Sequence, residues 1–181
     1  SLLGAKKIYP EALAILPRHL NSNVREFCAL YCEALPFTRP EDLPRQHFRE
    51  ILVVDTQGVP SARGFHKDTR VRIVDHHPLA RELKPGTTFA GGQAGATTTL
   101  FVAELREKEI ALDEIEASLL LLGIYEDTGS LCFTTTTAPD AHAAAFLLEQ
   151  GANLGIVNDF LHHPLNDAQR KLYGQLLERI E

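Results

Sequence analysis

The stretch Glu50-Ile51-Leu52-Val53-Val54-Asp55 decides the fold: it is a run of apolar, mainly β-branched residues that ends in an aspartate shortly before Gly58. Such runs are typical of strands that are buried on both faces of a parallel sheet. A second run of this kind, at residues 69–75, also ends in an aspartate. Because helical patterns alternate with these strands, we predict an α/β fold with an open, mainly parallel sheet and helices on both faces.

The remaining pattern adds a short strand at residues 12–16 and several helices with recognisable starts. Residues that commonly cap helices stand before most of these helices: Asn21 or Asn23 for 24–34, Asp113 for 114–122, and Thr137 for the helix that runs to Gln150. Gly123 is expected to break the helix at 114–122, and Asp140 is expected to complete a capping box with Thr137. Further helices are predicted at 97–108 and 167–181.

Composition narrows the class of protein. The chain has 181 residues, 44% of them hydrophobic, which suits one domain with a real core. No apolar stretch reaches membrane-spanning length, and three cysteines do not form a disulfide framework, so we expect reduced thiols and a cytoplasmic location. The net charge of -6 argues against broad, unspecific binding of nucleic acid.

Three apolar segments lead to an aspartate: Asp55, Asp75 and Asp127. The carboxyl ends of parallel strands line the ligand-binding edge of an open α/β sheet. Carboxylates gathered there repel one another unless a cation neutralises them, and oxygen ligands with an imidazole suit Mn²⁺ or Mg²⁺. The alternative is that each aspartate merely ends a strand or caps a helix, which is the commoner role for any single one. Three of them, one followed by two histidines, favour a metal site.

The triplet Asp75-His76-His77 is the sharpest feature of the sequence. Two imidazoles that follow a strand-final aspartate point in different directions, so that one can bind metal while the other meets substrate. The second doublet, His162-His163, follows a helical stretch and has no acidic strand end beside it. We therefore interpret it as a surface or packing pair.

Together these motifs resemble those of the DHH phosphoesterases. Asp75-His76-His77 is similar to the motif that names the family, and Asp55 lies 75 − 55 = 20 residues upstream, in a segment that looks like the second motif. Gly123-Ile124-Tyr125-Glu126-Asp127-Thr128-Gly129 resembles the fourth. The residues around Lys6-Lys7, Gly95–Thr99 and Thr135–Thr137 most resemble a branch in which the domain is fused to CBS domains and a poly(A) polymerase or tRNA nucleotidyltransferase module.

The resemblance implies roles for individual residues. Asp55 would bridge two Mn²⁺ ions, with Mg²⁺ as a possible substitute, and His76 and Asp127 would complete the second ion's site. His77 would contact the scissile phosphate, and Asp75 would orient an imidazole. Thr97 and Thr98, which open a helix after glycines, either bind phosphate or serve only as N-caps.

The resemblance also implies an organisation and an activity. Residues 1–165 would form the DHH domain without its first motif, His-x-x-x-Asp-x-Asp, which is expected within about ten residues before Ser1, a usual length for a helix. Residues 166–181 would be a helix that leads to a linker or to a substrate-binding domain. The expected activity is hydrolysis of short or single-stranded RNA or nucleotides, and a homodimer is possible. The alternatives are hydrolysis of polyphosphate or pyrophosphate, and a non-catalytic regulatory module in a tRNA-processing protein.

Overall fold

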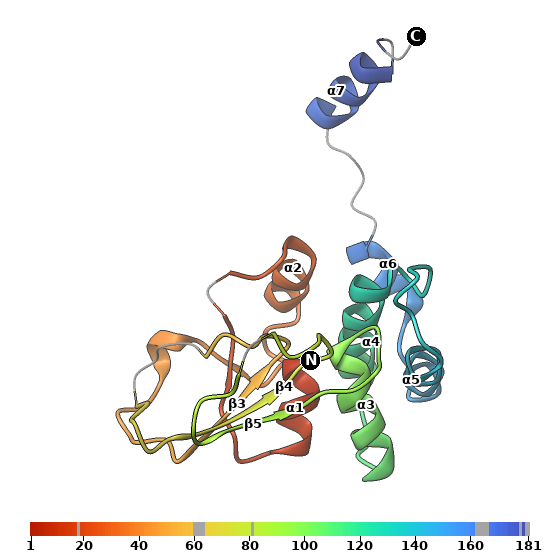
Figure 1. Ribbon diagram of the computed structural model, residues 1–181. Helices are drawn as coiled ribbons and strands as arrows, with labels where there is room; N and C mark the ends of the chain where they lie inside the picture. The colour runs from red at the N-terminus through yellow and green to blue at the C-terminus, as the bar shows by residue number, and fades with distance from the viewer. Residues whose placement is uncertain (18, 60–63, 81, 162–166, 178, 180–181) are drawn as a thin grey trace.

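The computed structural model describes residues 1–17, 19–59, 64–80, 82–161, 167–177 and 179 (Figure 1). Helices and short strands alternate up to residue 42, three strands then lie between residues 50 and 90, and the described elements from residue 97 onward are helices. The strands are β1 (Ala14–Ile15), β2 (Phe37–Thr38), β3 (Glu50–Val54), β4 (Arg70–Val74) and β5 (Thr87–Ala90). The helices are α1 (Leu2–Ile8), α2 (Ser22–Leu30), the 3-10 turn η1 (Pro40–Asp42), α3 (Thr97–Glu107), α4 (Glu114–Thr128), α5 (Ala138–Glu149), α6 (Leu154–Leu161) and α7 (Asp167–Leu177).

Every strand pair in the described part of the chain is parallel, which confirms the predicted α/β class with a parallel sheet. The larger sheet has the order β3-β4-β5, and β1 pairs with β2 in a separate two-stranded sheet. Strands β3 and β4 match the two apolar runs of the sequence. Strands β2 and β5 were not predicted, because segments of two and four residues are too short to show a strand period.

Helices α1 and α3 cover one face of the larger sheet (Figure 1). Ala5 of α1, Val74 of β4 and Phe101 of α3 form a buried apolar cluster there. The two helices approach very closely, since a Cβ placed on Gly4 would lie only 2.7 Å from the Cβ of Phe101. A residue without a side chain is therefore required at this crossing.

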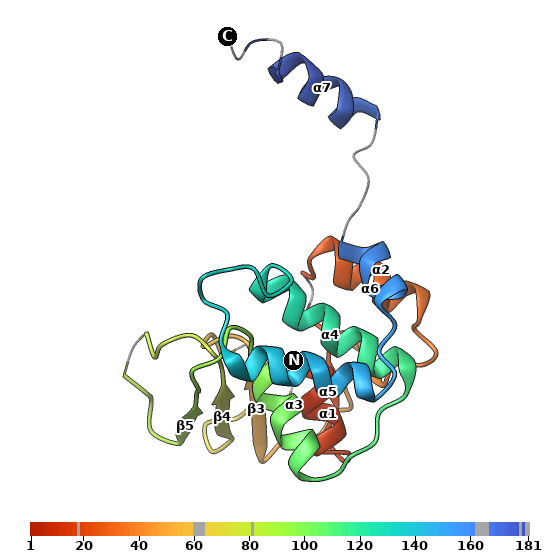
Figure 2. The same cartoon turned by 90° about the vertical axis from the view of Figure 1, so that its right-hand side faces the viewer.

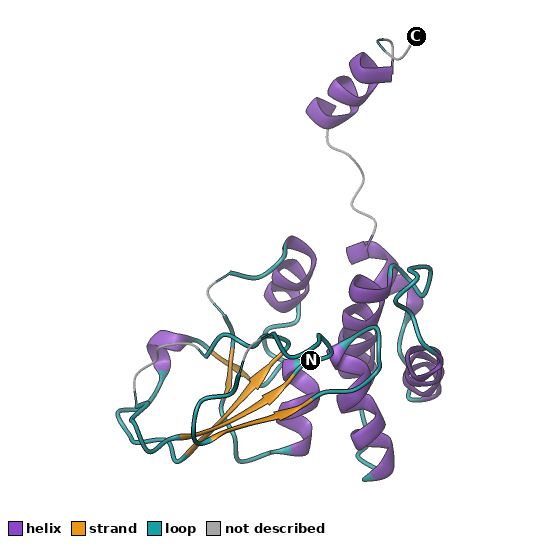
Figure 3. Cartoon of the chain, viewed as in Figure 1, coloured by secondary structure: helices purple, strands orange, loops and turns teal. Residues whose placement is uncertain are grey.

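Helix α4 is the centre of the helical half of the molecule, which lies beside the sheet (Figures 2 and 3). Its buried residues point in all directions, from Ala117 through Leu119–Leu122 to Ile124. Helices α3, α5 and α6 pack around it, and Phe27 of α2 joins the same core. A helix that is apolar on all sides is stable only when neighbours surround it.

Three predicted helix starts are confirmed. The Asn21 side chain accepts a hydrogen bond from the Val24 amide, and Asp113 forms a capping box with Glu116. At the start of α5, Asp140 accepts hydrogen bonds from Thr137, as the capping-box pattern predicts. These short-range contacts can be read from sequence because donor and acceptor lie within three residues of each other.

The prediction for residues 114–127 was wrong in one respect. Helix α4 does not break at Gly123 but continues to Thr128, so Asp127 lies in the last turn of a helix and not at the end of a strand. Gly123 serves close packing, because a Cβ at this position would lie 2.8 Å from the hydroxyl of Thr98. The helix ends at Gly129, whose φ of 56° is left-handed.

The C-terminal part of the chain is helical, as expected, from Asp167 to Leu177. In both views α7 stands apart from the other helices (Figures 1 and 2). The doublet His162-His163 lies outside the described residues. No helix among the residues that the structure describes combines the length and apolarity needed to span a membrane, and Cys28, Cys32 and Cys132 are free thiols.

The close approach of α1 and α3 gives a prediction for stability. Gly4→Ala should lower the free energy of unfolding by about 1–2 kcal/mol, because overpacking costs about 1–3 kcal/mol and the gain in helix propensity recovers up to ~1 kcal/mol. Gly174→Ala in α7 is the matched control, since nothing lies within 4 Å of a Cβ there. Urea unfolding should show a loss for the first variant and none for the second. Equal stability of the two variants would contradict the tight crossing.

Candidate metal centre

Strands β3 and β4 bring Asp55 and Asp75 together, because both aspartates directly follow strands that are paired in register. Val54 is the partner of Val74, and the Asp55 amide extends the ladder by donating to the Val74 carbonyl at 2.9 Å. Asp55 then leaves the strand with a φ of 62°. Among residues other than glycine, aspartate is one of the few that tolerate this left-handed conformation.

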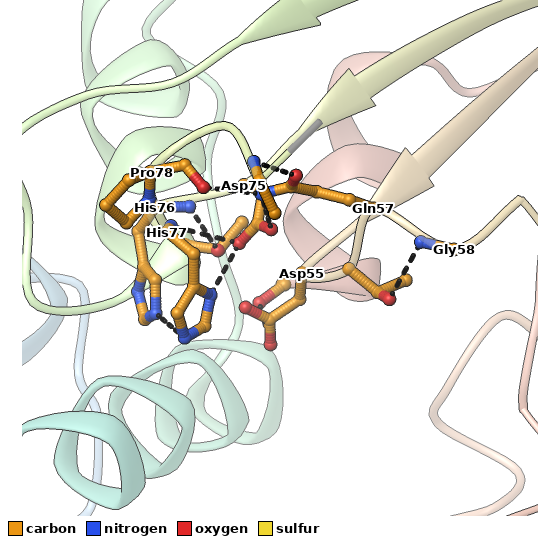
Figure 4. A network of polar contacts seen from close by, with 11 residues as sticks. Asp55, Gln57, Gly58, Asp75, His76, His77 and Pro78 are labelled. Carbon is orange, nitrogen blue, oxygen red and sulfur yellow. Dashed lines mark hydrogen bonds and ion pairs between the residues drawn. The ribbon is translucent and has the colours of Figure 1, made fainter. Parts of the chain in front are cut away.

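The Asp75 carboxylate is buried and fixes His77 (Figure 4). One of its oxygens, Oδ1, accepts from the His77 amide at 3.2 Å and lies 2.8 Å from His77 Nδ1. Burial alone would raise the pKa of Asp75, but the hydrogen bonds from His77 and Gln57 outweigh it and hold this pKa below its ordinary value. Asp75 is therefore a buried anion that orients the imidazole of His77.

His76 is held through its backbone and has an unsatisfied ring nitrogen. Its amide donates to Thr97 Oγ1 at 3.1 Å, and its Nε2 lies 3.1 Å from Nε2 of His77 (Figure 4). Its Nδ1 is buried and has no hydrogen-bond partner. Burial and the neighbouring His77 lower the pKa of His76. A neutral imidazole is the form that binds a metal ion.

These four residues form a potential ligand set. Asp55, Asp75, His76 and His77 each offer one ligand atom, and the four atoms lie within 4.8 Å of one another. Two carboxylates and two imidazoles suit Mn²⁺ better than a structural zinc ion, which prefers thiolates. The buried Nδ1 of His76, which no protein group satisfies, and the crowding of two carboxylates both fit a bound divalent cation.

Asp127 lies outside that set, but the charge of Asp55, a member of the set, acts on it. Burial, and next the negative charge of Asp55, raise the pKa of Asp127 to about 6. Its neighbour Glu126 accepts hydrogen bonds from the side-chain amides of Asn21, at 3.4 Å, and Asn23. These contacts connect the start of α2 to the end of α4, and no local pattern predicts them because more than a hundred residues separate the partners.

A cleft leads away from the centre along β3. Asp55, Glu126 and Asp127 line it, together with residues 12–16 and 50–54, most of which are apolar. Lys6 also lines it. Asp55 and Asp127 are thus open to this cleft, whereas Asp75, His76 and His77 are not among the residues that line it.

The three threonines that open α3 are buried, and each hydroxyl has a protein partner. Thr97 Oγ1 accepts from the His76 amide, and Thr98 Oγ1 lies 3.0 Å from the Ser1 amino group. Thr99 Oγ1 donates to Asp140 at 2.6 Å. The N-cap of α3 is Ala96, so none of the three threonines is the N-cap, and phosphate binding by Thr97 and Thr98 stays a prediction.

Asp140 does more than cap α5, and this larger role was missed from the sequence. Its fully buried carboxylate accepts from the Gly95 amide at 2.8 Å, from Thr99 Oγ1, and from the Thr137 amide and hydroxyl at 2.7 Å each. Burial raises its pKa, but these hydrogen bonds outweigh burial and hold the pKa below its ordinary value. Asp140 therefore joins α5 to the loop and helix that support His76.

The class of protein defined by this arrangement is a parallel α/β protein with a candidate Asp/His metal centre at the carboxyl edge of its sheet. No protein-family model matches the chain. Over 99% of its length the chain is 36% identical to an A-adding tRNA nucleotidyltransferase of Geobacter sulfurreducens, and over 98% it is 37% identical to one of Aquifex aeolicus. The chain spans about a fifth of each relative, 21% in both cases.

Shorter matches connect it to hydrolases. They include a bifunctional oligoribonuclease and PAP phosphatase of Mycoplasma genitalium (29% identity over 55% of this chain and 32% of the relative) and a probable manganese-dependent inorganic pyrophosphatase of Thermotoga maritima (29% over 60% and 20%). Among solved structures, a candidate family II inorganic pyrophosphatase of Methanococcus jannaschii shares the fold, with a TM-score of 0.64 and 20% identity over 88% of this chain and 56% of that one.

The chain belongs to the DHH phosphoesterase superfamily, as the motifs predicted. Within it, the relatives that match along nearly the whole chain are the A-adding tRNA nucleotidyltransferases.

The raised pKa of Asp127 predicts a pH-dependent effect in the metal-free chain. The charged form of Asp127 is disfavoured in the folded state, so ionising it lowers the stability of the fold. This loss of stability is absent below about pH 4, grows as the pH rises to about 6, and is complete above that. Asp127→Asn should therefore stabilise the chain at about pH 7.5, by on the order of 1 kcal/mol because solvent screens a partly exposed group. Thermal unfolding in chelator at about pH 7.5 and about pH 4 measures this. A gain that is equal at both pH values would contradict the assignment.

The Asp140 network predicts a large loss of stability. Asp140→Asn should lower the free energy of unfolding by on the order of 2–3 kcal/mol. The asparagine side chain has only one acceptor oxygen and no charge, so it cannot accept hydrogen bonds from all four donors. Asp159→Asn, at an exposed position of α6, is the control and should change little. The measurement is urea unfolding at neutral pH, and a change of less than about 1 kcal/mol for Asp140→Asn would show that the network is not critical.

Proposed function

We propose that this chain is the catalytic core of a metal-dependent phosphoesterase that uses Mn²⁺, with Mg²⁺ as a possible substitute. The observation that carries the proposal is the convergence of Asp55, Asp75, His76 and His77 within 4.8 Å at the carboxyl ends of two paired strands. That edge is where ligands bind in open parallel sheets. The hydrolase relatives, one of which is named as manganese-dependent, support the same chemistry.

The proposed roles follow from position and exposure. Asp55 is exposed at the centre and would bridge two ions, while His76 and Asp127 would complete the site of the second. The raised pKa of Asp127 and the unsatisfied Nδ1 of His76 are the signs of groups that gain from a cation. Bound ions would neutralise charge on the phosphoryl group and activate water as the nucleophile.

His77 is proposed to contact the scissile phosphate. Its side chain is 63% exposed, whereas that of Asp75 is 2% exposed. The Asp75 carboxylate occupies Nδ1, so Nε2 is the ring nitrogen that is left to meet a phosphate oxygen. Asp75 orients this ring and does not itself reach the substrate.

The proposed substrate is short or single-stranded RNA, or a nucleotide. The oligoribonuclease relative supports it, and Asp55 and Asp127 face a cleft in which a substrate could lie. The pyrophosphatase relatives support the competing proposal, hydrolysis of a phosphoanhydride such as pyrophosphate or polyphosphate. Both reactions require the same ligands, so substrate assays must separate them.

A second candidate function is a non-catalytic module of a tRNA-processing protein. The two relatives matched along nearly the whole chain are both A-adding tRNA nucleotidyltransferases, and this observation favours it. We also propose the fused context, with a nucleotidyltransferase module and CBS domains in the same protein, and the division into residues 1–165 and 166–181. If the intact protein hydrolysed none of these substrates, and changes in this chain lowered A-addition, the non-catalytic module would be favoured.

The site residues predict separable effects on hydrolysis and metal binding. Asp55→Ala should lower Mn²⁺-dependent hydrolysis by at least about 1000-fold, because no neighbour can replace a carboxylate that serves both ions. His77→Ala should lower kcat by roughly 10–100-fold and leave Mn²⁺ affinity nearly unchanged, because its proposed partner is the phosphate. His142→Ala, at an exposed position of α5, is the control.

The assays are Mn²⁺ calorimetry and cleavage of a short RNA, pyrophosphate and polyphosphate, carried out on this chain and on the product of the gene that encodes it. Normal activity of Asp55→Ala, or an equal loss in His142→Ala, would contradict the metal site. Cleavage of polyphosphate or pyrophosphate alone would leave the site in place and rule out RNA as the substrate.

A further inference from the structure

Gln57 lies two residues beyond Asp55 and spans the gap between the two strand ends that form the centre (Figure 4). Its Nε2 donates to Asp75 Oδ2 at 3.2 Å and to the Pro78 carbonyl at 3.0 Å. Its Oε1 accepts from the Ala80 amide at 2.9 Å. Both ends of the amide are thus engaged with the protein, and Gln57 is a part of the scaffold.

The hydrogen bonds of Asp75 show what Gln57 contributes. One oxygen of this carboxylate, Oδ1, receives both bonds from His77. The other, Oδ2, receives a bond from Gln57. A carboxylate that is only 2% exposed needs donors on both oxygens, since water cannot supply them. Without Gln57 the carboxylate would be free to rotate toward other donors, and the imidazole of His77 would lose its fixed partner.

Gln57 also fixes the backbone directly after the two histidines. The His76 amide is held by Thr97 and the His77 amide by Asp75, and beyond the histidines Gln57 binds the Pro78 carbonyl and the Ala80 amide. The segment that carries both imidazoles is therefore held at each end. Because Gln57 belongs to the same strand end as Asp55, it also couples the position of that aspartate to the position of the histidines.

We propose that Gln57 is a positioning residue that sets the orientation of the His77 imidazole through Asp75. The inference rests on the proposed function of His77, since only a ring that meets substrate makes its orientation matter for turnover. The chemistry of the side chain fits this role closely. Glutamate could still accept from Ala80 but would place a second negative charge beside Asp75, and asparagine is one methylene too short to reach both partners.

In the metal-free chain the proposed orientation defines the tautomer of His77. A neutral ring that donates from Nδ1 to Asp75 carries its lone pair on Nε2 and accepts there from Nε2–H of His76, which explains the 3.1 Å separation of these two nitrogens. Loss of Gln57 should relax this arrangement. The tautomer is therefore a direct readout of positioning that needs neither metal nor substrate.

The test compares Gln57→Ala and Gln57→Glu with Gln175→Ala, at an exposed position of α7. Two-bond ¹H–¹⁵N spectra of the metal-free chain at about pH 8 should show His77 as the Nδ1–H tautomer in the parent and in Gln175→Ala. Both Gln57 variants should show a mixture with Nε2–H. In steady-state assays of the gene product they should lose roughly 10–100-fold in kcat, with KM changed less than about threefold.

The outcomes separate the possible roles. The proposal would be overturned by an unchanged tautomer in a folded Gln57→Glu chain. It would also be overturned by a lower melting temperature with unchanged tautomer and kcat, which would mean that Gln57 only stabilises the fold. Gln57→Glu keeps the bond to Ala80, so it tests the proposal even where Gln57→Ala does not fold. A shifted tautomer in a gene product that hydrolyses nothing would support the positioning of His77 while the proposed function fails.

Discussion

The parallel pairing of β3 with β4 is the constraint on which the rest of the structure depends. Their register places Val54 opposite Val74, so the two residues that follow, Asp55 and Asp75, emerge at the same edge of the sheet. A slip of one residue would send one of the two side chains to the other face. The apolar residues of both strands fix that register, because they must meet α1 and α3 on the covered face.

Two carboxylates at one edge of the sheet repel each other, and hydrogen bonds fully stabilise only one of them. Asp75 is buried and satisfied by His77 and Gln57, which keep it ionised. Asp55 accepts a single long bond, at 3.4 Å, from the Ser1 hydroxyl, and none of the described residues donates to Asp127. Burial together with the charge of Asp55 therefore raises the pKa of Asp127. The difference between the fully hydrogen-bonded Asp75 and these two weakly bonded carboxylates separates the scaffold of the centre from the groups that a cation would serve.

How much could be predicted from sequence depended on the distance along the chain between interacting residues. Local patterns predict the two strands, the caps at Asn21 and Asp113, and the DHH triplet. Long-range partners have no such pattern. The bonds of Gln57 to Asp75 and of Asp140 to Thr99 span 18 and 41 residues, and nothing in the sequence around either donor indicates its acceptor.

The segment that leads to Asp127 shows how a sequence can match a family motif while its secondary structure is predicted wrongly. An apolar segment followed by an acid fits both a buried strand and a helix that is surrounded on all sides, and periodicity alone does not separate them. The glycine in the segment was interpreted as a break, but it is the point where α4 packs against Thr98. Only tertiary packing distinguishes the two uses of glycine.

The helical origin of Asp127 also matters for chemistry. Asp55 and Asp75 are held rigidly by one sheet, whereas Asp127 comes from α4, whose position depends on the core that it shares with α3, α5 and α6. Asp140 links α5 to the start of α3, and Thr97 links α3 to His76, so the same packing that places Asp127 also places the imidazole. The distance between Asp127 and the candidate ligands on the sheet is therefore set by the hydrophobic core. A change deep in that core would alter the candidate metal centre even though it touches none of the candidate ligands.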